Sequence, residues 1–242
     1  WSISKDDSEV LTAATKALGS NSRSWSTFIS RWEDLRVVLK GFDPDWVAEV
    51  NPKDLLPFFP GQSGPADSRS VVAWGENLRD NPGYWRFLRH LMDTLQDRAA
   101  TAHVVIEDDE MMPLMAATIG FARATSKVPF VRKAPGMRGI LASEFLRNLG
   151  LSGFKPDRHV TRLLSRWFPG GPERMRPRAV ALARLIGMSS KDPVEFLTFS
   201  LLALRVTPPG IPLSHVDNLV WLLGSYVERK GRETDRRYAL TR

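Results

Sequence analysis

One aspartate in this sequence is well placed to take part in chemistry. Asp157 opens a predicted helix whose apolar residues share one face at 100° per residue. Asp157 lies at the edge of that face and in the first turn, where the helix dipole stabilises a negative charge. A carboxylate at such a partly desolvated junction is a candidate functional group. The apolar residues of the face are Val160, Leu163, Leu164 and Trp167, and the opposite side is lined by Arg158, Arg162 and Arg166.

A turn upstream of Asp157 is suited to hold a phosphate. Gly136 and Gly139 permit positive φ and leave backbone N–H groups uncovered at the start of a helix. Backbone amides in such a place attract phosphate oxygens. The cations of Lys133 and Arg138 lie beside the turn in the sequence and add positive charge. We therefore expect an anion to bind there.

Helices must position both features. Apolar residues recur at helical spacing along most of the chain, and breaks coincide with proline and glycine clusters. No run alternates long enough to indicate a sheet, and no internal repeat is present, so we predict an all-α fold. Residues 57–68 are predicted to form a loop. The main predicted helices span 24–39, 71–78, 84–95, 97–106, 111–124, 139–149, 157–167, 174–186, 193–204 and 214–229.

Composition excludes several classes of site. The chain has 242 residues and no cysteine, which rules out disulfides, thiolate catalysis, zinc–thiolate sites and iron–sulfur clusters. The four histidines are scattered, and none pairs with another at the spacing of metal ligands. We therefore expect no metal site and no cofactor. The histidines are His90, His103, His159 and His215.

Charge is distributed unevenly. Residues 121–242 hold 22 of the 34 Lys and Arg but 9 of the 27 Asp and Glu, a net charge of +13, whereas residues 1–120 carry −6. A strongly basic half suggests a polyanionic partner on one face. No apolar run approaches the length needed to span a bilayer, and no signal peptide opens the sequence. We expect no membrane partner and a cytoplasmic or nucleoid-associated location, or a nuclear one in a eukaryote.

The segment 128–167 resembles the helix-hairpin-helix motif and following aspartate of the base-excision DNA glycosylases. The hairpin pattern of that superfamily is roughly Leu-Pro-Gly-Val-Gly-x-Lys-x-Ala, which residues 134–142 match in part. Its next string, Val/Pro-Asp-x-His-Val-x-Arg, is matched by residues 156–162. The spacing between hairpin and aspartate agrees within one residue. Weaker similarity extends to residues 218–224.

Two departures from the family pattern limit the chemistry that the resemblance implies. Arg138 stands where the family has its second hairpin glycine, and Gly139 is displaced by one position. Ile140 occupies the position at which bifunctional members carry a Schiff-base lysine. The resemblance therefore implies a monofunctional enzyme without lyase activity, and the absence of cysteine implies the branch without an iron–sulfur cluster.

The resemblance also implies an architecture. Two helical lobes are expected to carry the helix-hairpin-helix motif and a catalytic cleft between them, all within one catalytic unit. The expected divisions are 1–242 for the unit, about 30–150 for the central lobe ending in the hairpin at 128–149, and about 1–29 with 151–242 for the lobe that carries Asp157.

The implied reaction is excision of a damaged or modified base, with an alkylated purine as the preferred substrate. The protein is expected to act as a monomer, bend double-stranded DNA, flip the nucleotide and hydrolyse its N-glycosidic bond. Asp157 would stabilise the oxocarbenium-like sugar and help orient water. The hairpin amides would hold a phosphate, with a monovalent cation as a possible companion. The expected DNA contacts are Lys133, Pro135, Gly136, Met137, Arg138, Gly139, Lys155, Arg158 and Arg162, and the expected base pocket contains Trp32, Trp46 and Trp85.

Other interpretations stay open at this stage. Asp157 can be a helix-capping acid alone, because aspartate is common at that position. A non-catalytic helix-hairpin-helix DNA-binding protein would keep the fold without turnover. A helical module that binds a protein partner would show no salt-dependent affinity for DNA. A nuclease is disfavoured because no carboxylates cluster to hold Mg²⁺.

Overall fold

The computed structural model describes residues 5–21, 25–122 and 132–227, and every regular element in these ranges is helical. The all-α prediction is confirmed. No helix in the described ranges is both long and apolar enough to cross a membrane. The α-helices are α1 (Asp7–Gly19), α2 (Trp25–Ile29), α3 (Trp32–Val38), α4 (Pro44–Glu49), α5 (Gly64–Asp80), α6 (Tyr84–Thr101), α7 (Met111–Phe121), α8 (Gly139–Asn148), α9 (Arg158–Trp167), α10 (Gly171–Leu185), α11 (Lys191–Val206) and α12 (Leu213–Leu222). Short 3₁₀ helices span Pro52–Phe58 and Asp108–Glu110, and a π-helical turn spans Leu223–Val227.

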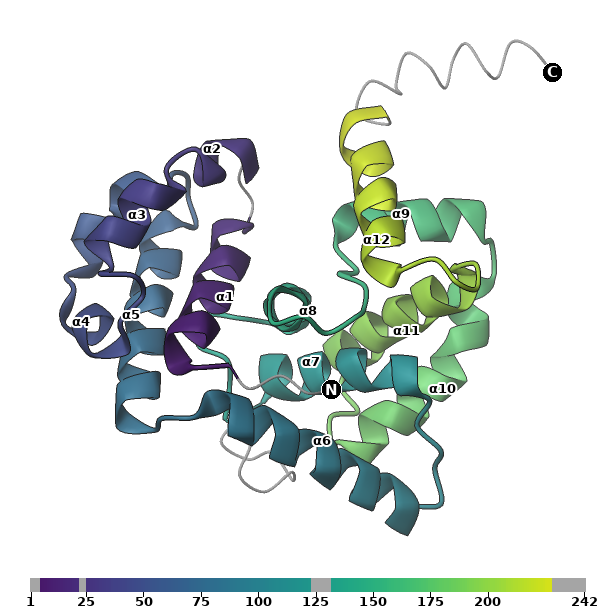
Figure 1. Ribbon diagram of the computed structural model, residues 1–242. Helices are drawn as coiled ribbons and strands as arrows, with labels where there is room; N and C mark the ends of the chain where they lie inside the picture. The colour runs from purple at the N-terminus through teal and green to yellow at the C-terminus, as the bar shows by residue number, and fades with distance from the viewer. Residues whose placement is uncertain (1–4, 22–24, 123–131, 228–242) are drawn as a thin grey trace.

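The helices gather in two groups around α8. Figure 1 shows α1–α5 on one side, α9–α12 on the other, α8 between them and α6 along the base. One large cluster of buried hydrophobic residues draws on α1–α8, α10 and α11, so the two groups share a core. A smaller cluster joins α9 and α12 to α11. The expected catalytic cleft stays a prediction.

The position of α1 differs from the grouping expected for the two lobes. We expected residues 1–29 to lie with 151–242, but α1 lies beside α5 and α8 in the first group (Figure 1). The amide of Asn148, at the end of α8, donates a hydrogen bond to the carbonyl of Ala13 at 3.2 Å. The reason is burial, because eight residues of α1 are inaccessible on the faces that meet these two helices.

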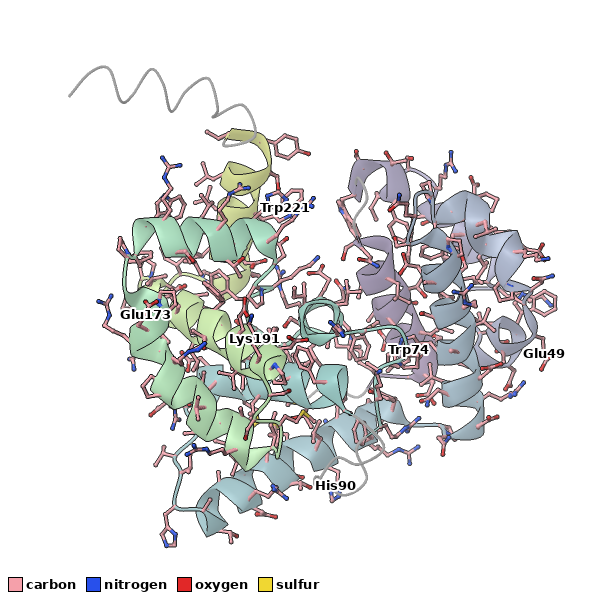
Figure 2. All side chains as sticks on the ribbon, turned by 180° about the vertical axis from the view of Figure 1, so that it is seen from behind. Glu49, Trp74, His90, Glu173, Lys191 and Trp221 are labelled. Carbon is pink, nitrogen blue, oxygen red and sulfur yellow. The ribbon has the colours of Figure 1, made fainter. Side chains whose placement is uncertain are left out.

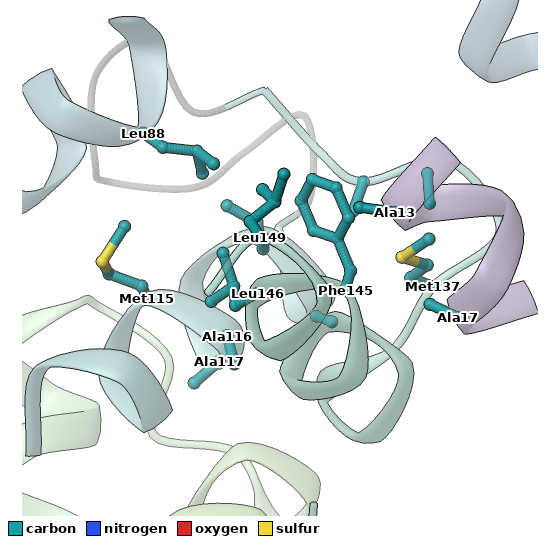
Figure 3. Close-up of a cluster of buried hydrophobic side chains, with 14 of the residues drawn as sticks. Ala13, Ala17, Leu88, Met115, Ala116, Ala117, Met137, Phe145, Leu146 and Leu149 are labelled. Carbon is teal, nitrogen blue, oxygen red and sulfur yellow. The ribbon is translucent and has the colours of Figure 1, made fainter. Parts of the chain in front are cut away.

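Helix α7 forms the centre of the core beneath α8. All residues from Met111 to Gly120 are buried, as expected of a helix that is hydrophobic around its whole circumference. Figure 3 shows Met115 and Ala116 of α7 in one buried cluster with Leu146 of α8 and with Leu149, which directly follows that helix. The start of α8 and the turn before it are therefore packed against α7, the most buried helix of the molecule.

Three predicted boundaries are wrong. The single helix expected over 24–39 is broken into α2 and α3, and the Ser30 hydroxyl there donates to the carbonyl of Thr27 at 3.0 Å, in competition with the helix. The expected loop 57–68 contains the start of α5, with proline in the first turn, where it is tolerated. Helices 84–95 and 97–106 are one helix, α6, because its buried face continues to Ala99.

Candidate active site and nucleic-acid interface

The turn before α8 is held by hydrogen bonds to the core. The Ala134 amide donates to the carbonyl of Ile119 in α7 at 3.1 Å. The indole of Trp74, in α5, donates to the carbonyl of Pro135 at 3.0 Å (Trp74 is labelled in Figure 2). The Met137 amide closes the turn onto the Ala134 carbonyl at 3.2 Å. The turn is thus rigidly placed by α5 and α7.

The two turn glycines have different roles. Gly136 has a φ of +68°, as predicted, and a Cβ there would lie 2.0 Å from the Ser70 hydroxyl oxygen. Gly139 is not among the residues with positive φ, so that part of the prediction is wrong. A Cβ at Gly139 would meet the rings of Phe121 at 2.6 Å and Phe196 at 2.9 Å. Gly139 is required for close packing rather than for backbone conformation.

The start of α8 is uncapped and basic. Arg138 is the N-cap and makes no side-chain capping bond, and the first intrahelical bond runs from the Ala142 amide to the Arg138 carbonyl at 2.9 Å. The side chains of Lys133 and Arg138 are exposed. Arg138 lies 3.5 Å from Asp192, but both side chains are mostly exposed, and such a pair is weak. This end of α8 therefore presents positive charge to solvent.

The structure describes only part of the expected hairpin. Its first helix, near 128–131, lies outside the described residues, so the helix pair stays a prediction. Met137 is 1% exposed as a whole residue, and its expected contact with DNA stays a prediction. The carbonyls of Ala134 and Pro135 already accept the hydrogen bonds described above. Each carbonyl oxygen keeps a second lone pair, and a monovalent cation at the turn stays a prediction.

Asp157 is the N-cap of α9. Its Oδ1 atom accepts hydrogen bonds from the amides of His159 at 2.8 Å and Val160 at 3.0 Å. Its backbone is extended, with φ of −76° and ψ of 179°, and its side chain is half-buried. The second carboxylate oxygen has no hydrogen-bond partner among the described residues. Asp157 therefore caps its helix with one oxygen and offers the other to a ligand.

The two faces of α9 follow the predicted pattern, apart from one residue. Val160, Leu163 and Leu164 are buried, and the arginines at 158, 162 and 166 are exposed on the other side. Trp167, expected on the buried face, is 44% exposed at the end of the helix. The Arg162 guanidinium donates to the carbonyl of Gly224 at 2.8 Å.

A small aromatic group packs against the first turn of α9. The His159 ring lies edge-on to Trp221 at 6.4 Å between centroids, and Trp221 lies edge-on to Tyr226 at 6.0 Å. His159 Nδ1 is 3.2 Å from the carbonyl of Gly224, in the π-helical turn. Because Asp157 binds the His159 amide, these aromatics are neighbours of the candidate carboxylate. Neither Trp221 nor Tyr226 was predicted from the sequence as a residue of the site.

Lys155 is committed to contacts inside the protein. Its Nζ donates to the Ser20 hydroxyl, just after α1, at 3.0 Å, and lies 3.8 Å from Glu144 Oε2. The side chain is 14% exposed. This arrangement gives Lys155 a structural role, and its expected DNA contact stays a prediction.

A buried aspartate on α12 binds the chain just before Asp157. Asp217 is 3% exposed, and its Oδ1 accepts the Lys155 amide at 3.0 Å. Its Oδ2 lies 2.6 Å from Arg147 Nη1, on α8. Burial raises the pKa of Asp217 to about 6, against the opposing effects of Arg147 and of the Lys155 amide. Asp217 thus holds the backbone two residues before the candidate carboxylate, and a buried group with a shifted pKa in such a place is a candidate member of the site.

A sequence signal for Asp217 existed. Leu213, Asp217, Val220 and Gly224 recur at helical spacing, and the last three are buried in the structure. A charged residue on an otherwise apolar stripe marks a side chain with a buried partner. The partner itself was not predictable, because Arg147 lies 70 residues away in the chain.

The structure places the three pocket tryptophans on separate helices. Trp32 lies in α3, Trp46 in α4 and Trp85 in α6, and no ring contact joins them among the described residues. A protein cation already lies over each ring: Lys16 over Trp32, Lys40 over Trp46, and Arg86 and Arg89 over Trp85. The pocket that they were expected to form stays a prediction.

In the part of the chain that the structure describes, two cavities have walls that do not include Asp157. One, of about 280 Å³, lies beside the end of α8 and includes Glu144 and Arg147 in its wall. The other, of about 670 Å³, lies between α6 and α10. No group of three or more His, Asp or Glu side chains in the described ranges is placed to hold a metal ion. No family model, characterised protein or solved structure was found to match this chain. The function must therefore be inferred from the sequence motifs and the geometry described above.

Proposed function

We propose that this protein is a monofunctional DNA N-glycosylase in which Asp157 is the catalytic carboxylate. The observation that carries the proposal is that the two carboxylate oxygens of Asp157 differ in their contacts. Oδ1 caps α9, whereas the other oxygen has no partner among the described residues. The string 156–162, which resembles the glycosylase signature, surrounds this residue.

The reaction needs a negative charge beside the sugar. As the bond between C1′ and the base nitrogen breaks, its electron pair leaves with the base and the sugar becomes oxocarbenium-like. A carboxylate that faces this cation in a partly dry site stabilises it far more than one in water does. Water then adds to C1′, and its proton goes to the solvent, because a cationic alkylated base that takes the electron pair leaves as a neutral molecule. Ile140 cannot form a Schiff base, so the product is an abasic site without a strand break.

DNA binding is assigned to two basic surfaces. The uncapped start of α8, with Lys133 and Arg138 exposed, would bind a backbone phosphate and set the position of the duplex without reading its sequence. The exposed side of α9 adds Arg158 and Arg162. We propose double-stranded DNA as the partner and a monomer as the active form.

The base is assigned to the aromatic group on α9 and α12. Trp221 packs on His159, whose amide is capped by Asp157, and Tyr226, which packs on Trp221, is 65% exposed. Within 5–21, 25–122 and 132–227, no protein cation lies over the Trp221 ring, unlike the rings of the three tryptophans expected from sequence. A cationic, alkylated purine stacks well on an electron-rich ring. Alkylated purine is therefore the proposed substrate class.

The deciding experiment is base release from DNA that carries alkylated and deaminated bases. Freed bases are measured by mass spectrometry for the wild type and for Asp157→Asn, because asparagine caps helices about as well as aspartate but lacks the charge. Asp43→Asn is the matched control: Asp43 Oδ1 caps α4 through the amides two and three residues ahead, as Asp157 does in α9. Release by wild type and Asp43→Asn, and not by Asp157→Asn, is expected, with abasic sites and no strand breaks.

Other outcomes would identify the alternatives. If neither protein releases a base but both bind DNA with a steep salt dependence, the chain is a non-catalytic DNA-binding protein. If DNA affinity is absent as well, a helical module that binds another protein takes its place. Equal release by wild type and Asp157→Asn would leave Asp157 as a capping residue only.

A further inference from the structure

The segment that carries Asp157 is tied to two distant helices through one side chain. Asp217, in α12, accepts the Lys155 amide with one oxygen at 3.0 Å and binds Arg147 of α8 with the other at 2.6 Å. Lys155 is two residues before Asp157, and the Asp157 amide in turn donates to the Lys155 carbonyl at 2.7 Å. A chain of hydrogen bonds therefore connects α8 to the candidate carboxylate.

Further charges surround this link. Glu144 Oε2 lies 3.1 Å from Arg147 Nη1 and 3.8 Å from Lys155 Nζ, so Asp217 has one further carboxylate and two cations as neighbours. The Arg147 guanidinium also donates to the side chain of Asn218 at 3.3 Å. The side chains of Glu144, Arg147 and Lys155 are each less than one fifth exposed. The group joins α1, α8, α12 and the segment before α9.

We propose that Asp217 is the positioning residue of the site, which fixes Asp157 relative to α8 by holding the Lys155 amide. This inference rests on the proposed function and adds a residue that acts through another. A catalytic carboxylate must keep its place within a fraction of an ångström, and a partner that locks the backbone beside it achieves this. The start of α8, which would hold the phosphate, and the start of α9 are thereby kept at a set separation.

The cost of this arrangement supports a role beyond packing. A buried ion pair is often no more stabilising than apolar residues of similar volume, because desolvation offsets the attraction. The raised pKa of Asp217 shows that burial outweighs the nearby cations here. Unlike an apolar residue, the aspartate makes two directional contacts: one oxygen binds the Lys155 amide and the other binds Arg147 of α8.

The first test follows the backbone amides by NMR in the full chain. In the wild type, the Lys155 amide shift should titrate with a midpoint near 6, and this transition should vanish in Asp217→Asn. Hydrogen exchange of the His159 and Val160 amides, which Asp157 caps, should accelerate about tenfold in that variant, while amides of α5 are unchanged. The control is Glu33→Gln, an exposed carboxylate that binds Arg36 at 3.1 Å.

A second variant covers the case in which Asp217→Asn folds poorly because Arg147 stays buried without its partner. The double variant Asp217→Leu with Arg147→Met removes both charges and also the acceptor of the Lys155 amide, while it keeps side chains of similar volume. Accelerated exchange at His159 and Val160 in either variant, with α5 amides unchanged, supports positioning. Unchanged exchange in both variants would overturn it.

The activity measurement separates this inference from the proposed function. With damaged DNA, a folded Asp217 variant should lose about 10- to 100-fold in kcat while its Kd for DNA is unchanged. If the wild type releases bases and the variants match it in kcat, positioning fails and the glycosylase assignment stands. If the wild type releases none, that assignment fails, and the amide measurements still decide whether Asp217 holds the segment.

Discussion

The starts of α8 and α9 are opposite in character, although each helix has ten residues. The N-cap of α8 is Arg138, which makes no capping bond, and exposed cations surround it. The N-cap of α9 is Asp157, which binds two amides with its own carboxylate. The start of α8 keeps its positive charge and suits an anion. At the start of α9 the Asp157 carboxylate neutralises the positive end of the helix dipole and presents a negative group to a cation. Two helix starts in one segment thus carry opposite charges, which is what the proposed base excision would require.

Capping by itself does not distinguish Asp157. Asp6 and Asp43 cap α1 and α4 in the same manner, and both are exposed. Asp157 differs in its surroundings, because Asp217 holds the preceding backbone and aromatic rings pack on the following turn. The difference between helix starts therefore identifies a candidate site only together with the contacts that surround each N-cap residue.

Removal of the charge at α9 should have the largest effect. Asp157→Asn should lower kcat for base release by about 10²- to 10³-fold, because stabilisation of the sugar cation is lost. Thermal stability should be unchanged, since asparagine caps as well as aspartate. Single-turnover kinetics and thermal melts check both expectations. An unchanged kcat would remove the functional difference between the two helix starts.

The pH dependence of stability tests the link between the two helix starts. The Asp217 carboxyl has a pKa of about 6 in the folded protein, against an ordinary value of 3.8. The folded state thus binds the proton more tightly, so this residue contributes stability below about pH 4 that is lost as the pH rises to about 6, a change of about 3 kcal/mol. Urea unfolding measures the free energy of unfolding of the wild type and of Asp217→Asn across this pH range. The wild type should lose stability relative to the variant as the pH rises from about 4 to about 6. A difference independent of pH would contradict the buried, shifted carboxyl.

The turn before α8 should be sensitive to a single methyl group. Gly136→Ala should lower the free energy of unfolding by about 1–3 kcal/mol, because φ is positive and the new Cβ would strike Ser70. Gly41→Ala is the control, with φ of +72° and no atom within 4 Å of a new Cβ. Urea titrations should therefore show a larger loss at Gly136. Equal losses would mean that the Ser70 side chain moves away from the new Cβ at little cost in free energy.

Single cations at the start of α8 should have the smallest effect. Lys133→Gln and Arg138→Gln should each reduce the salt dependence of DNA binding by about one unit of slope. Lys53→Gln, exposed in the 3₁₀ helix 52–58, should leave the slope unchanged. Fluorescence anisotropy over a range of salt concentrations measures the slope. If all three variants behave alike, the basic end of α8 is not where DNA binds.

Much of the local structure was predictable, because helical periodicity is a property of a few neighbouring residues. The buried face of α9 at Val160, Leu163 and Leu164, and the positive φ of Gly136, followed from residue type and spacing. The break between α2 and α3 was not predicted, since it coincides with one hydroxyl that competes for a backbone carbonyl.

The sequence by itself determined an all-helical protein, the faces of α9 and the place of Asp157 at a helix start. Only the tertiary structure decided that Gly139 is needed for packing against Phe121 and Phe196, and that Asp217 holds the Lys155 amide. The reason is physical: amphipathic spacing is set along one helix, whereas close approach and the pairing of buried charges depend on which helices meet.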